Sequence, residues 1–309
     1  MIQKIKNFIK NPLSFIAHMT NFVSDDKVYI QIQYFCYLHK FLNLKNPQTY
    51  NEKMQWMKLY NRNPLYTKLV DKIEAKKYVD SILGSGHTFP LLGSWERVED
   101  VDFDTLPNEF VLKCNHNSAV GMSICKDKAK GVYTRAHGGD KIYITKEKVI
   151  DELRKGLAED FYRSGREWPY KDVKRRVFAE KFMKSDDGGQ LKDYKILCFD
   201  GDPKYIWVGA NYDPMWFDLY SADWQNMHVK WGYDAGPDKL PRPAQLEELL
   251  DVAHKLSQGI PHVRVDLYSI GGTVYFGEFT FFTWAGLMKL EPAIWDKKLG
   301  DLIKLPTEQ

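Results

Sequence analysis

The chain has 309 residues, of which 44% are hydrophobic, 28% charged and 14% aromatic. This composition is typical of a globular protein, and the length predicts two or three lobes, each with its own core. The net charge of +3 is close to neutral, so nucleic acid is not an expected partner. The four cysteines show neither CxxC pairing nor zinc-finger spacing. We therefore expect no disulfide framework, and a reducing cytoplasm fits.

The first sixteen residues combine lysines with isoleucine and phenylalanine at helical spacing. No uninterrupted apolar run follows, so the segment predicts neither a signal peptide nor a membrane-spanning helix. A basic amphipathic helix of this kind either packs on its own protein or makes peripheral contact with an anionic membrane. Both alternatives stay open at this stage, and the second would place the protein at the inner face of the membrane.

The first half of the chain alternates between helical and strand patterns. Residues 47–83 have helical spacing and end at Gly84-Ser85-Gly86. Short strands are expected at 89–92, 110–113 and 123–125, and a further helical stretch at 146–163.

The second half is rich in strand patterns. A hairpin is expected around the Asp200-Gly201-Asp202-Pro203 turn, and a helix over residues 244–257. Two final strands, HVRVDLY and TVYFGEFTF, flank Gly271-Gly272 and predict a second hairpin.

The last hairpin carries the strongest chemical signal. Arg264 and Asp266 alternate with apolar residues and so share one face of their strand, as Glu278 and Thr280 do on the partner strand. With the turn at Gly271-Gly272, Asp266 and Glu278 fall close to opposite each other. Two facing carboxylates are the ligands that Mg²⁺ prefers. A solvated face neutralised by Arg264 is the alternative.

Three lysines stand where a triphosphate would need cations. Lys113 ends the strand FVLK and opens the loop CNHNSAVG, whose small residues permit close approach of the backbone to phosphates. Lys195 lies in the strand DYKILCF and Lys72 in the helical stretch LVDKIEAKKYV. Each alone is more often a surface lysine, but together they favour a nucleotide site.

The order of these features resembles the ATP-grasp superfamily, and in particular the D-alanine:D-alanine ligases. Four motifs carry the resemblance: Asp71-Lys72, Lys113 with Val120-Gly121-Met122, Glu180-Lys181-Phe182-Met183, and the pair of strands with Arg264, Asp266, Glu278 and Thr280. The superfamily usually has Asn where this chain has Thr280. A hydroxyl is also a magnesium ligand, so the resemblance leaves the number of metal ions open.

The chain resembles the TupA-like ATP-grasp family over roughly residues 43 to 306. The stretches that carry this resemblance are NPQTYNEKMQWMKLYNRNPLYTKLVDK, PLLGSWE, FVLKCNH, GREWPYKDVK, AEKFM, LKDYKILCFDG and VRVDLY. Members are associated with bacterial surface-polysaccharide genes. After Thr280 this chain reads FFTWAG, where the family pattern has a Pro-Gly-Ser-Gly loop, so substrate choice is the property that the resemblance specifies least.

The resemblance implies an α+β ATP-grasp fold, with two lobes clasping ATP after a helical N-terminal region. The expected divisions are a mostly helical region at 1–88, a lid lobe at 89–180 and a C-terminal lobe with the catalytic hairpin at 181–309.

The resemblance also implies ATP and Mg²⁺ as cofactors and a carboxylate-amine ligase that forms an acyl phosphate. The expected metal ligands are Asp266, Glu278 and Thr280, and the expected catalytic residues are Arg264, Lys195 and His116. The expected nucleotide-binding residues are Lys72, Lys113, Lys195, Glu180, Lys181, Phe182 and Met183, with Asp186 or Asp187 at the ribose. The loop 115–121 is expected to close as a lid, and His116 either contacts phosphate or substrate or caps this loop.

Aromatic residues suggest the substrate. They gather at 161–170 and 205–232, as Trp168, Tyr170, Trp207, Tyr212, Trp216, Tyr220, Trp224 and Trp231. Sugars stack on such rings, which would suit an amino acid joined to a uronic acid of a bacterial surface polysaccharide. The alternative is that these rings fill strand cores.

Two other functions remain as alternatives. A glycosyltransferase would use the Asp-x-Asp patterns at 100–104 or 200–202, although the second lies in a turn where Asp and Gly are expected for backbone reasons. The second alternative is a nucleotide-binding scaffold with a degenerate site. The retained lysines and carboxylates argue against this alternative.

Overall fold

The structure is a computed structural model, and it describes residues 20–118, 120–135, 143–186, 188, 191–210, 216–236 and 240–306. The predicted helix at the N-terminus, Asp187 and Tyr212 lie outside these residues. Helices and antiparallel sheets are both present, which confirms the α+β class. None of the helices in the described part of the chain is long and apolar enough to cross a membrane.

One lobe is built on a six-stranded antiparallel sheet. Its strands, in spatial order, are β1 (Leu91–Trp95), β6 (Val177–Lys181), β2 (Phe110–Cys114), β3 (Ser123–Asp127), β4 (Val132–Arg135) and β5 (Tyr143–Ile144). Helix α7 (Lys146–Ala158) packs on β2 through Val149 and Leu153, which are fully buried with Phe110 and Leu112. This lobe therefore has its own apolar core.

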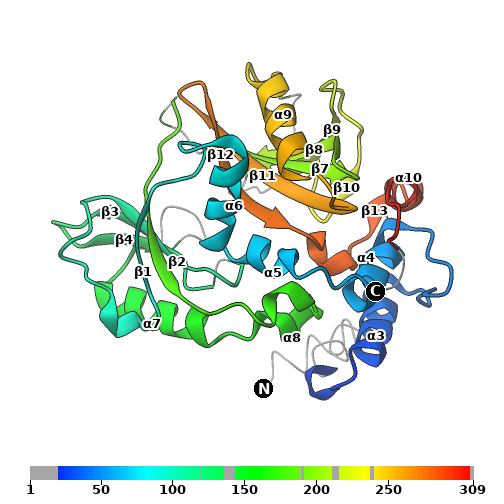
Figure 1. Cartoon of the computed structure of the whole chain (residues 1–309), viewed down its shortest axis with the longest axis horizontal. Coiled ribbons are helices and arrows are strands. Elements are labelled where there is room, and N and C mark those ends of the chain that lie inside the picture. Colours follow the sequence, from blue (N-terminus) through cyan, green and yellow to red (C-terminus); the bar gives the residue numbers. More distant parts are fainter. Residues whose placement is uncertain are drawn as a thin grey trace.

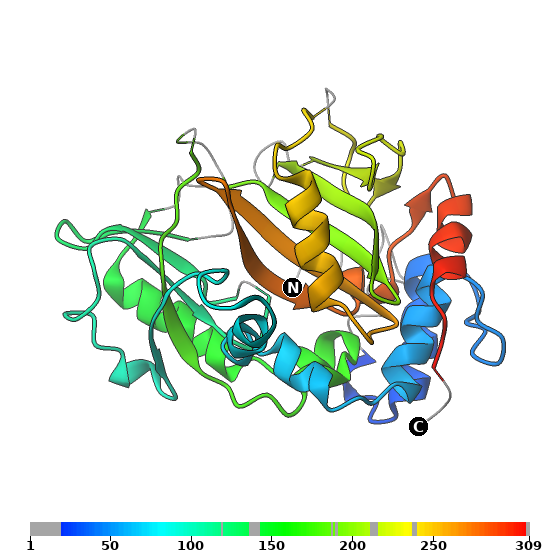
Figure 2. The ribbon, with the colours of Figure 1, turned by 45° about the horizontal axis from the view of Figure 1, so that its top comes forward.

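The second lobe is built on a five-stranded antiparallel sheet. Its strands, in spatial order, are β12 (Thr273–Thr280), β11 (His262–Ile270), β7 (Asp193–Phe199), β8 (Asp202–Ala210) and β9 (Trp216–Ser221). Helix α9 (Leu246–Leu256) covers one face of this sheet (Figure 2). The predicted hairpins β7–β8 and β11–β12 are both confirmed.

The remaining helices surround and connect the two sheets. They are α3 (Asp26–Leu38), α4 (Tyr50–Tyr60), α5 (Leu65–Val70), α6 (Glu74–Leu83), α8 (Phe161–Gly165) and α10 (Ile294–Leu302), with four short 3₁₀ turns, η1 (Thr20–Phe22), η2 (Val98–Asp100), η3 (Trp168–Tyr170) and η4 (Thr283–Gly286). A small sheet pairs β10 (Lys230–Trp231) with β13 (Leu290–Glu291). Helix α6 lies between the two large sheets (Figures 1 and 2).

Local signals explain where the helices begin and end. Thr49 and Glu52 form a capping box at the start of α4, and Thr145 caps α7. The helical pattern predicted over 47–83 is divided into three helices, because the chain turns at Asn61 to Pro64 and again at Asp71. The first predicted strand was placed two residues early, since β1 begins at Leu91.

The turn of the β11–β12 hairpin joins the two lobes. Gly271 and Gly272 both have positive φ angles, 59° and 75°, which glycine adopts without strain. The backbone N–H of Gly271 donates to the Asp186 carboxylate, 2.8 Å away, in the segment that follows β6. The hairpin turn is thus held against the segment that links the two sheets.

Candidate active site

The β11–β12 hairpin brings the predicted acidic residues together. The register pairs Asp266 with Glu278 and Arg264 with Thr280, as predicted from the sequence. The alternating residues Val263, Val265 and Leu267 are fully buried and lie in the same apolar core as the inner residues of α9. All four polar residues therefore lie on the sheet face opposite α9.

Asp266 is the most buried of these carboxylates, at 1% exposure. Arg264 donates to it in a bidentate pair, Nε to Oδ1 and Nη2 to Oδ2, both at 2.7 Å. Lys195 on β7 donates to Oδ2 at 3.1 Å and also pairs with Asp193. Burial would lower the pKa of Lys195, but Asp193 and Asp266 outweigh that effect and raise it. Lys195 therefore stays charged.

Glu278 faces three cations. Its Oε2 lies 3.2 Å from Nζ of Lys72, and its Oε1 lies 3.8 Å from Nη2 of Arg264. Burial alone would raise the pKa of Glu278, but the charges of Lys72, Arg264 and Lys195 lower it to about 2. The carboxylate is therefore ionised, and its side chain keeps 38% exposure. An ionised and partly accessible carboxylate is suited to hold a metal ion.

A second charged cluster lies on the six-stranded sheet. The Glu180 carboxylate pairs with Lys76 on α6 at 2.8 Å and with Lys113 on β2 at 2.5 Å. Glu180 is 4% exposed, and burial would raise its pKa, but the two lysines outweigh that effect and lower it. Lys113 also lies over the Phe178 ring at 5.4 Å. Glu180 thus fixes the position of Lys113, and its expected contact with adenine stays a prediction.

Lys72 is held by contacts with the loop after β2. Its Nζ donates to the carbonyl of Asn117 at 2.8 Å, and its backbone N–H donates to the carbonyl of Asn115 at 3.1 Å. Lys72 therefore links Glu278 of the five-stranded sheet to a loop of the six-stranded sheet.

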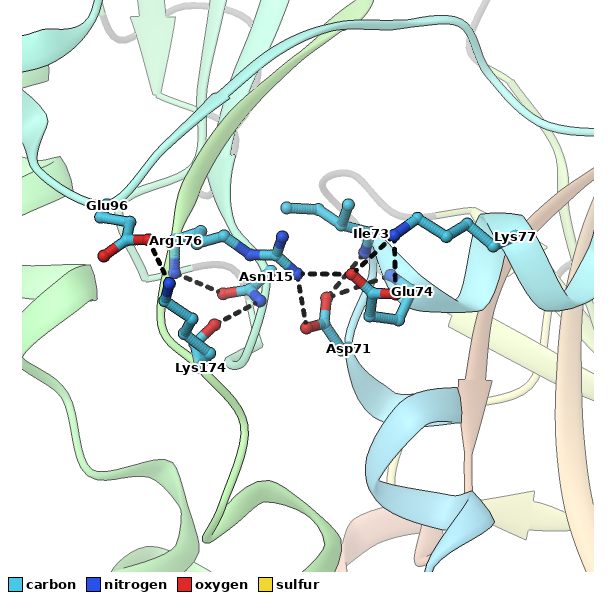
Figure 3. A network of polar contacts seen from close by, with 8 residues as sticks. All are labelled: Asp71, Ile73, Glu74, Lys77, Glu96, Asn115, Lys174 and Arg176. Carbon is cyan, nitrogen blue, oxygen red and sulfur yellow. Dashed lines mark hydrogen bonds and ion pairs between the residues drawn. The ribbon is translucent and has the colours of Figure 1, made fainter.

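Figure 3 shows the polar network around Asp71, the residue that precedes Lys72. Asp71 accepts from the backbone N–H of Ile73 at 2.9 Å in the turn just before α6. The Arg176 Nη2 donates to Asp71 and to Glu74, both at 3.0 Å. The side chain of Asn115 accepts from the backbone N–H of Arg176 at 2.8 Å. These contacts fix the turn that carries Lys72, so this lysine is held in place by three separate segments.

The start of the predicted lid is packed against α7. The Asn117 amide donates to the carbonyl of Gly156 and to the Glu159 carboxylate. His116 is 1% exposed, and its Nε2 lies 3.1 Å from the carbonyl of Glu159. Burial lowers the pKa of His116, so the ring is neutral. These contacts favour the expectation that His116 caps the loop over the expectation that it contacts phosphate or substrate.

The other predicted nucleotide residues lie at the end of β6 and directly after it. Lys181 is exposed, and Phe182 and Met183 are half-buried. Nζ of Lys126 lies 4.7 Å from the centre of the Phe182 ring. Asp186 binds the hairpin turn, and Asp187 lies outside the described residues.

The Asp-x-Asp patterns do not join this site. Asp102 accepts from the backbone N–H of Asp104 in its own loop, and Asp200 pairs with Lys304 at 2.9 Å. Asp202 pairs with Lys204 at 2.5 Å. These contacts do not favour a sugar-nucleotide site.

Most of the predicted aromatic residues fill cores. Trp207, Trp231 and Tyr220 are at most 3% exposed. Trp207 nevertheless lies 5.9 Å below the Arg264 guanidinium and contacts Tyr233 and Trp284. The alternative that these rings are structural therefore holds for most of them.

Three charged residues of the site were missed from the sequence, Lys76, Asp193 and Glu167, and Tyr170 was expected only as a ring for sugar stacking. Lys76 lies four residues after Lys72, so helical periodicity would have indicated it. Asp193 lies two residues before Lys195, so strand periodicity would have indicated it. Burial raises the pKa of Asp193 to about 6. Glu167 and Tyr170 lie at a short 3₁₀ turn, where no periodicity is available.

The side chains on this face suit Mg²⁺ better than a metal ion that takes all of its ligands from the protein. Within the described ranges no group of three or more His, Cys, Asp or Glu side chains gathers closely enough to hold a metal ion by itself. Asp266 and Glu278 supply carboxylate oxygens, and Thr280 adds a hydroxyl on the same face. Mg²⁺ commonly takes one or two carboxylates and completes its shell with phosphate oxygens and water.

Comparison with known proteins gives one family. The model of the TupA-like ATPgrasp family matches residues 52–304. No match was found among the curated proteins.

Solved structures similar to this chain include several ligases. D-alanine–D-alanine ligase from Bacillus anthracis complexed with ATP is 16% identical, with a TM-score of 0.38, and covers 74% of this chain and 55% of its own. The Helicobacter pylori D-alanine–D-alanine ligase is 14% identical, with a TM-score of 0.42, over 84% and 70%. The L-amino acid ligase from Bacillus licheniformis is 14% identical, with a TM-score of 0.41, over 85% and 55%. The chain thus spans a little over half the length of two of these three enzymes.

Proposed function

Because the chain belongs to the TupA-like ATP-grasp family, we propose that it is an ATP-dependent ligase that joins a carboxylate to an amine and releases ADP and phosphate. The observation that supports this most is the hairpin pair Asp266 and Glu278, which faces Lys195 of its own sheet and Lys72 from the turn before α6. An acyl phosphate is the expected intermediate, since the transferred phosphoryl group activates the carboxylate for attack by the amine.

The proposed metal ligands are Asp266, Glu278 and Thr280. Bound magnesium would neutralise the charge of the terminal phosphates. Lys72, Lys113 and Lys195 are proposed to bind phosphate oxygens, and the ion pairs that hold Lys72 and Lys195 would place both cations beside the metal ligands. The backbone of 181–183 is proposed to contact adenine, with Asp186 or Asp187 at the ribose.

Arg264 is the proposed stabiliser of the oxyanion that forms when the amine attacks. A guanidinium has five N–H donors, and the bidentate pair with Asp266 uses two of them. That pair also fixes the orientation of the group, so its remaining donors are preorganised. Because Asp266 holds Arg264 in this way, the metal site and the oxyanion site are coupled through one carboxylate.

For the substrates, we propose an amino acid and a uronic acid of a bacterial surface polysaccharide or its precursor. The family resemblance and the half-buried rings of Tyr233 and Trp284, which contact Trp207 below Arg264, support this choice. We also propose that the chain works in the cytoplasm and divides functionally at residues 88 and 180.

The test is an incubation of the protein with ATP, magnesium, a panel of amino acids and uronic-acid glycosides. Mass spectrometry should find an amide product together with ADP and phosphate. A sugar transferred from a nucleotide sugar, with no use of ATP under any combination, would instead support the glycosyltransferase alternative.

A further inference from the structure

We propose that Glu167 and Tyr170 form the binding site for the ammonium group of the amine substrate. This inference rests on the proposed ligase function and assigns a chemistry to two residues that this function leaves unused. Both residues flank or belong to η3, which contacts α5.

Glu167 is a buried carboxylate whose hydrogen-bonding capacity is unused. It is 8% exposed, and within the described part of the chain no hydrogen bond and no ion pair within 4 Å reaches its carboxylate oxygens. An ionised carboxylate in such surroundings is unfavourable unless a cation or donor pairs with it. Burial, opposed by Lys58 and Arg264, raises the pKa of Glu167 to about 7, which agrees with a shortage of partners.

Lys58 is the nearby cation that would be the ordinary partner, but its donors are already used. An ammonium group has three N–H donors. Those of Lys58 point to Gln55 Oε1 at 3.1 Å, to the Gly165 carbonyl at 2.7 Å and to the Ala285 carbonyl at 2.6 Å. Lys58 therefore influences Glu167 through its charge alone, and the carboxylate keeps its acceptor positions for another group.

The segment around Glu167 packs against the end of the hairpin that carries the metal ligands. Lys58 bridges the carbonyls of Gly165 and Ala285, and a Cβ at Gly165 would lie 3.2 Å from the Ala285 side chain. The Tyr66 ring stacks on Phe281 at 4.2 Å and contacts Trp168 at 6.0 Å. Phe281 directly follows Thr280, so Glu167 is held close to the proposed reaction centre.

The segment is also rigid. Arg166 has a positive φ of 53° and is 5% exposed, and it donates from Nη2 to the carbonyl of Val23 at 2.6 Å. Such a conformation in a residue other than glycine persists only where the surroundings fix it. The Glu167 side chain thus projects from a backbone that is held on both sides.

Tyr170 adds a hydroxyl to the same place. Its backbone N–H donates to the carbonyl of Glu167 at 3.2 Å, so both residues belong to one tight turn. Burial and then the charges of Glu167 and Glu278 raise the pKa of this hydroxyl. The Tyr170 ring is fixed by an edge contact with Phe161 at 4.7 Å. A carboxylate and a hydroxyl oxygen together offer acceptors to the three N–H groups of an ammonium ion, next to Arg264 where the acyl carbon is proposed to lie.

The first test compares wild type with Glu167→Gln, which keeps the shape and removes the charge. Both are assayed with ATP, magnesium and glucuronic acid, using either hydroxylamine or a panel of the twenty amino acids as nucleophile. Hydroxylamine is uncharged at neutral pH and needs no ammonium site. We expect the hydroxamate rate of the variant to stay within about threefold of wild type, and the KM for the amino acid to rise roughly 30-fold, as expected for losing one buried charge-assisted contact.

Asp218→Asn is the matched control. Asp218 is 2% exposed and burial raises its pKa, but it pairs with Val208 and so lies on the sheet face opposite that of Trp207. Its KM for the amino acid should not change. Should Glu167→Gln fail to fold, Tyr170→Phe takes its place and should raise the same KM about tenfold. An unchanged KM in the folded variant would overturn the inference.

A second measurement does not depend on ligation. Crystals grown with magnesium are soaked in rubidium chloride, because rubidium is close to ammonium in size and is located by its anomalous scattering. A peak at Glu167 in wild type that is lost in Glu167→Gln supports the cation site, and no peak in wild type overturns it. If wild type forms neither hydroxamate nor amide, the ligase proposal fails, while the rubidium density still decides whether Glu167 binds a cation.

Discussion

Glu278→Gln separates the catalytic role of this residue from its structural one. The cations around Glu278 lower its pKa from the ordinary 4.5 to about 2. In a fully desolvated group this difference would correspond to about 3 kcal/mol. The side chain is 38% exposed, however, so water screens the charges and we expect a loss of about 1 kcal/mol in the free energy of unfolding. The substitution also removes repulsion between Glu278 and Asp266, but the attraction of Lys72 and Arg264 outweighs this gain.

The pH dependence of this loss has a defined sign. Because the folded pKa of Glu278 is lowered, its contribution is complete above the ordinary pKa of 4.5 and is lost as the pH falls toward 2. Wild type and Glu278→Gln should therefore differ by about 2 °C in Tm at pH 7 and converge in acid. The rate of ATP-dependent ligation should fall on the order of a thousandfold, since a metal ligand is lost.

Glu152→Gln is the control for this experiment. Glu152 on α7 is also a carboxylate close to three cations, Arg135, Lys148 and Lys155, and they lower its pKa. We expect a similar small change in Tm and a normal rate. Ligation by Glu278→Gln at a near-normal rate would refute its assignment to the metal site, and loss of both rate and fold would make Glu278 structural.

Three further outcomes follow from the same contacts. Asp266→Asn removes the buried charge that pairs with Arg264 and that Lys195 shares with Asp193, and calorimetry should show a loss of about 3 to 5 kcal/mol in the free energy of unfolding. Lys113→Met should raise the KM for ATP roughly tenfold, and a wild-type KM would remove Lys113 from the nucleotide site. Burial raises the pKa of Glu167 to about 7, although the charges of Lys58 and Arg264 oppose this shift. The free energy of unfolding should therefore fall as the pH rises from about 4.5 to 7. Urea titrations should show that this slope is absent in Glu167→Gln.

Strand periodicity was enough to predict the hairpin part of the site. The alternation of Arg264 and Asp266 with apolar residues, and the glycines at the turn, determine both the face and the register, and the structure pairs Asp266 with Glu278 as predicted. Repeating patterns and turn residues are local signals, so they can be recognised in a single sequence.

The partners of the charged residues could not be predicted in the same way. Glu180 pairs with two lysines from other elements, and Lys72 reaches Glu278 across about two hundred residues of chain. Such pairs depend on how the two sheets pack, which no local pattern encodes. Glu167 was missed for a related reason, since the segment before it is joined to the segment after Thr280 through Lys58, which bridges the carbonyls of Gly165 and Ala285.

Oxygen transfer from the carboxylate tests the central claim most directly. The protein is incubated with ATP, magnesium, amino acids and uronic acid labelled with ¹⁸O in its carboxylate, and the released phosphate is examined by mass spectrometry. An acyl phosphate predicts one ¹⁸O atom in inorganic phosphate, with ADP as the other product. Label in AMP, or amide product with unlabelled phosphate, would contradict the proposed mechanism.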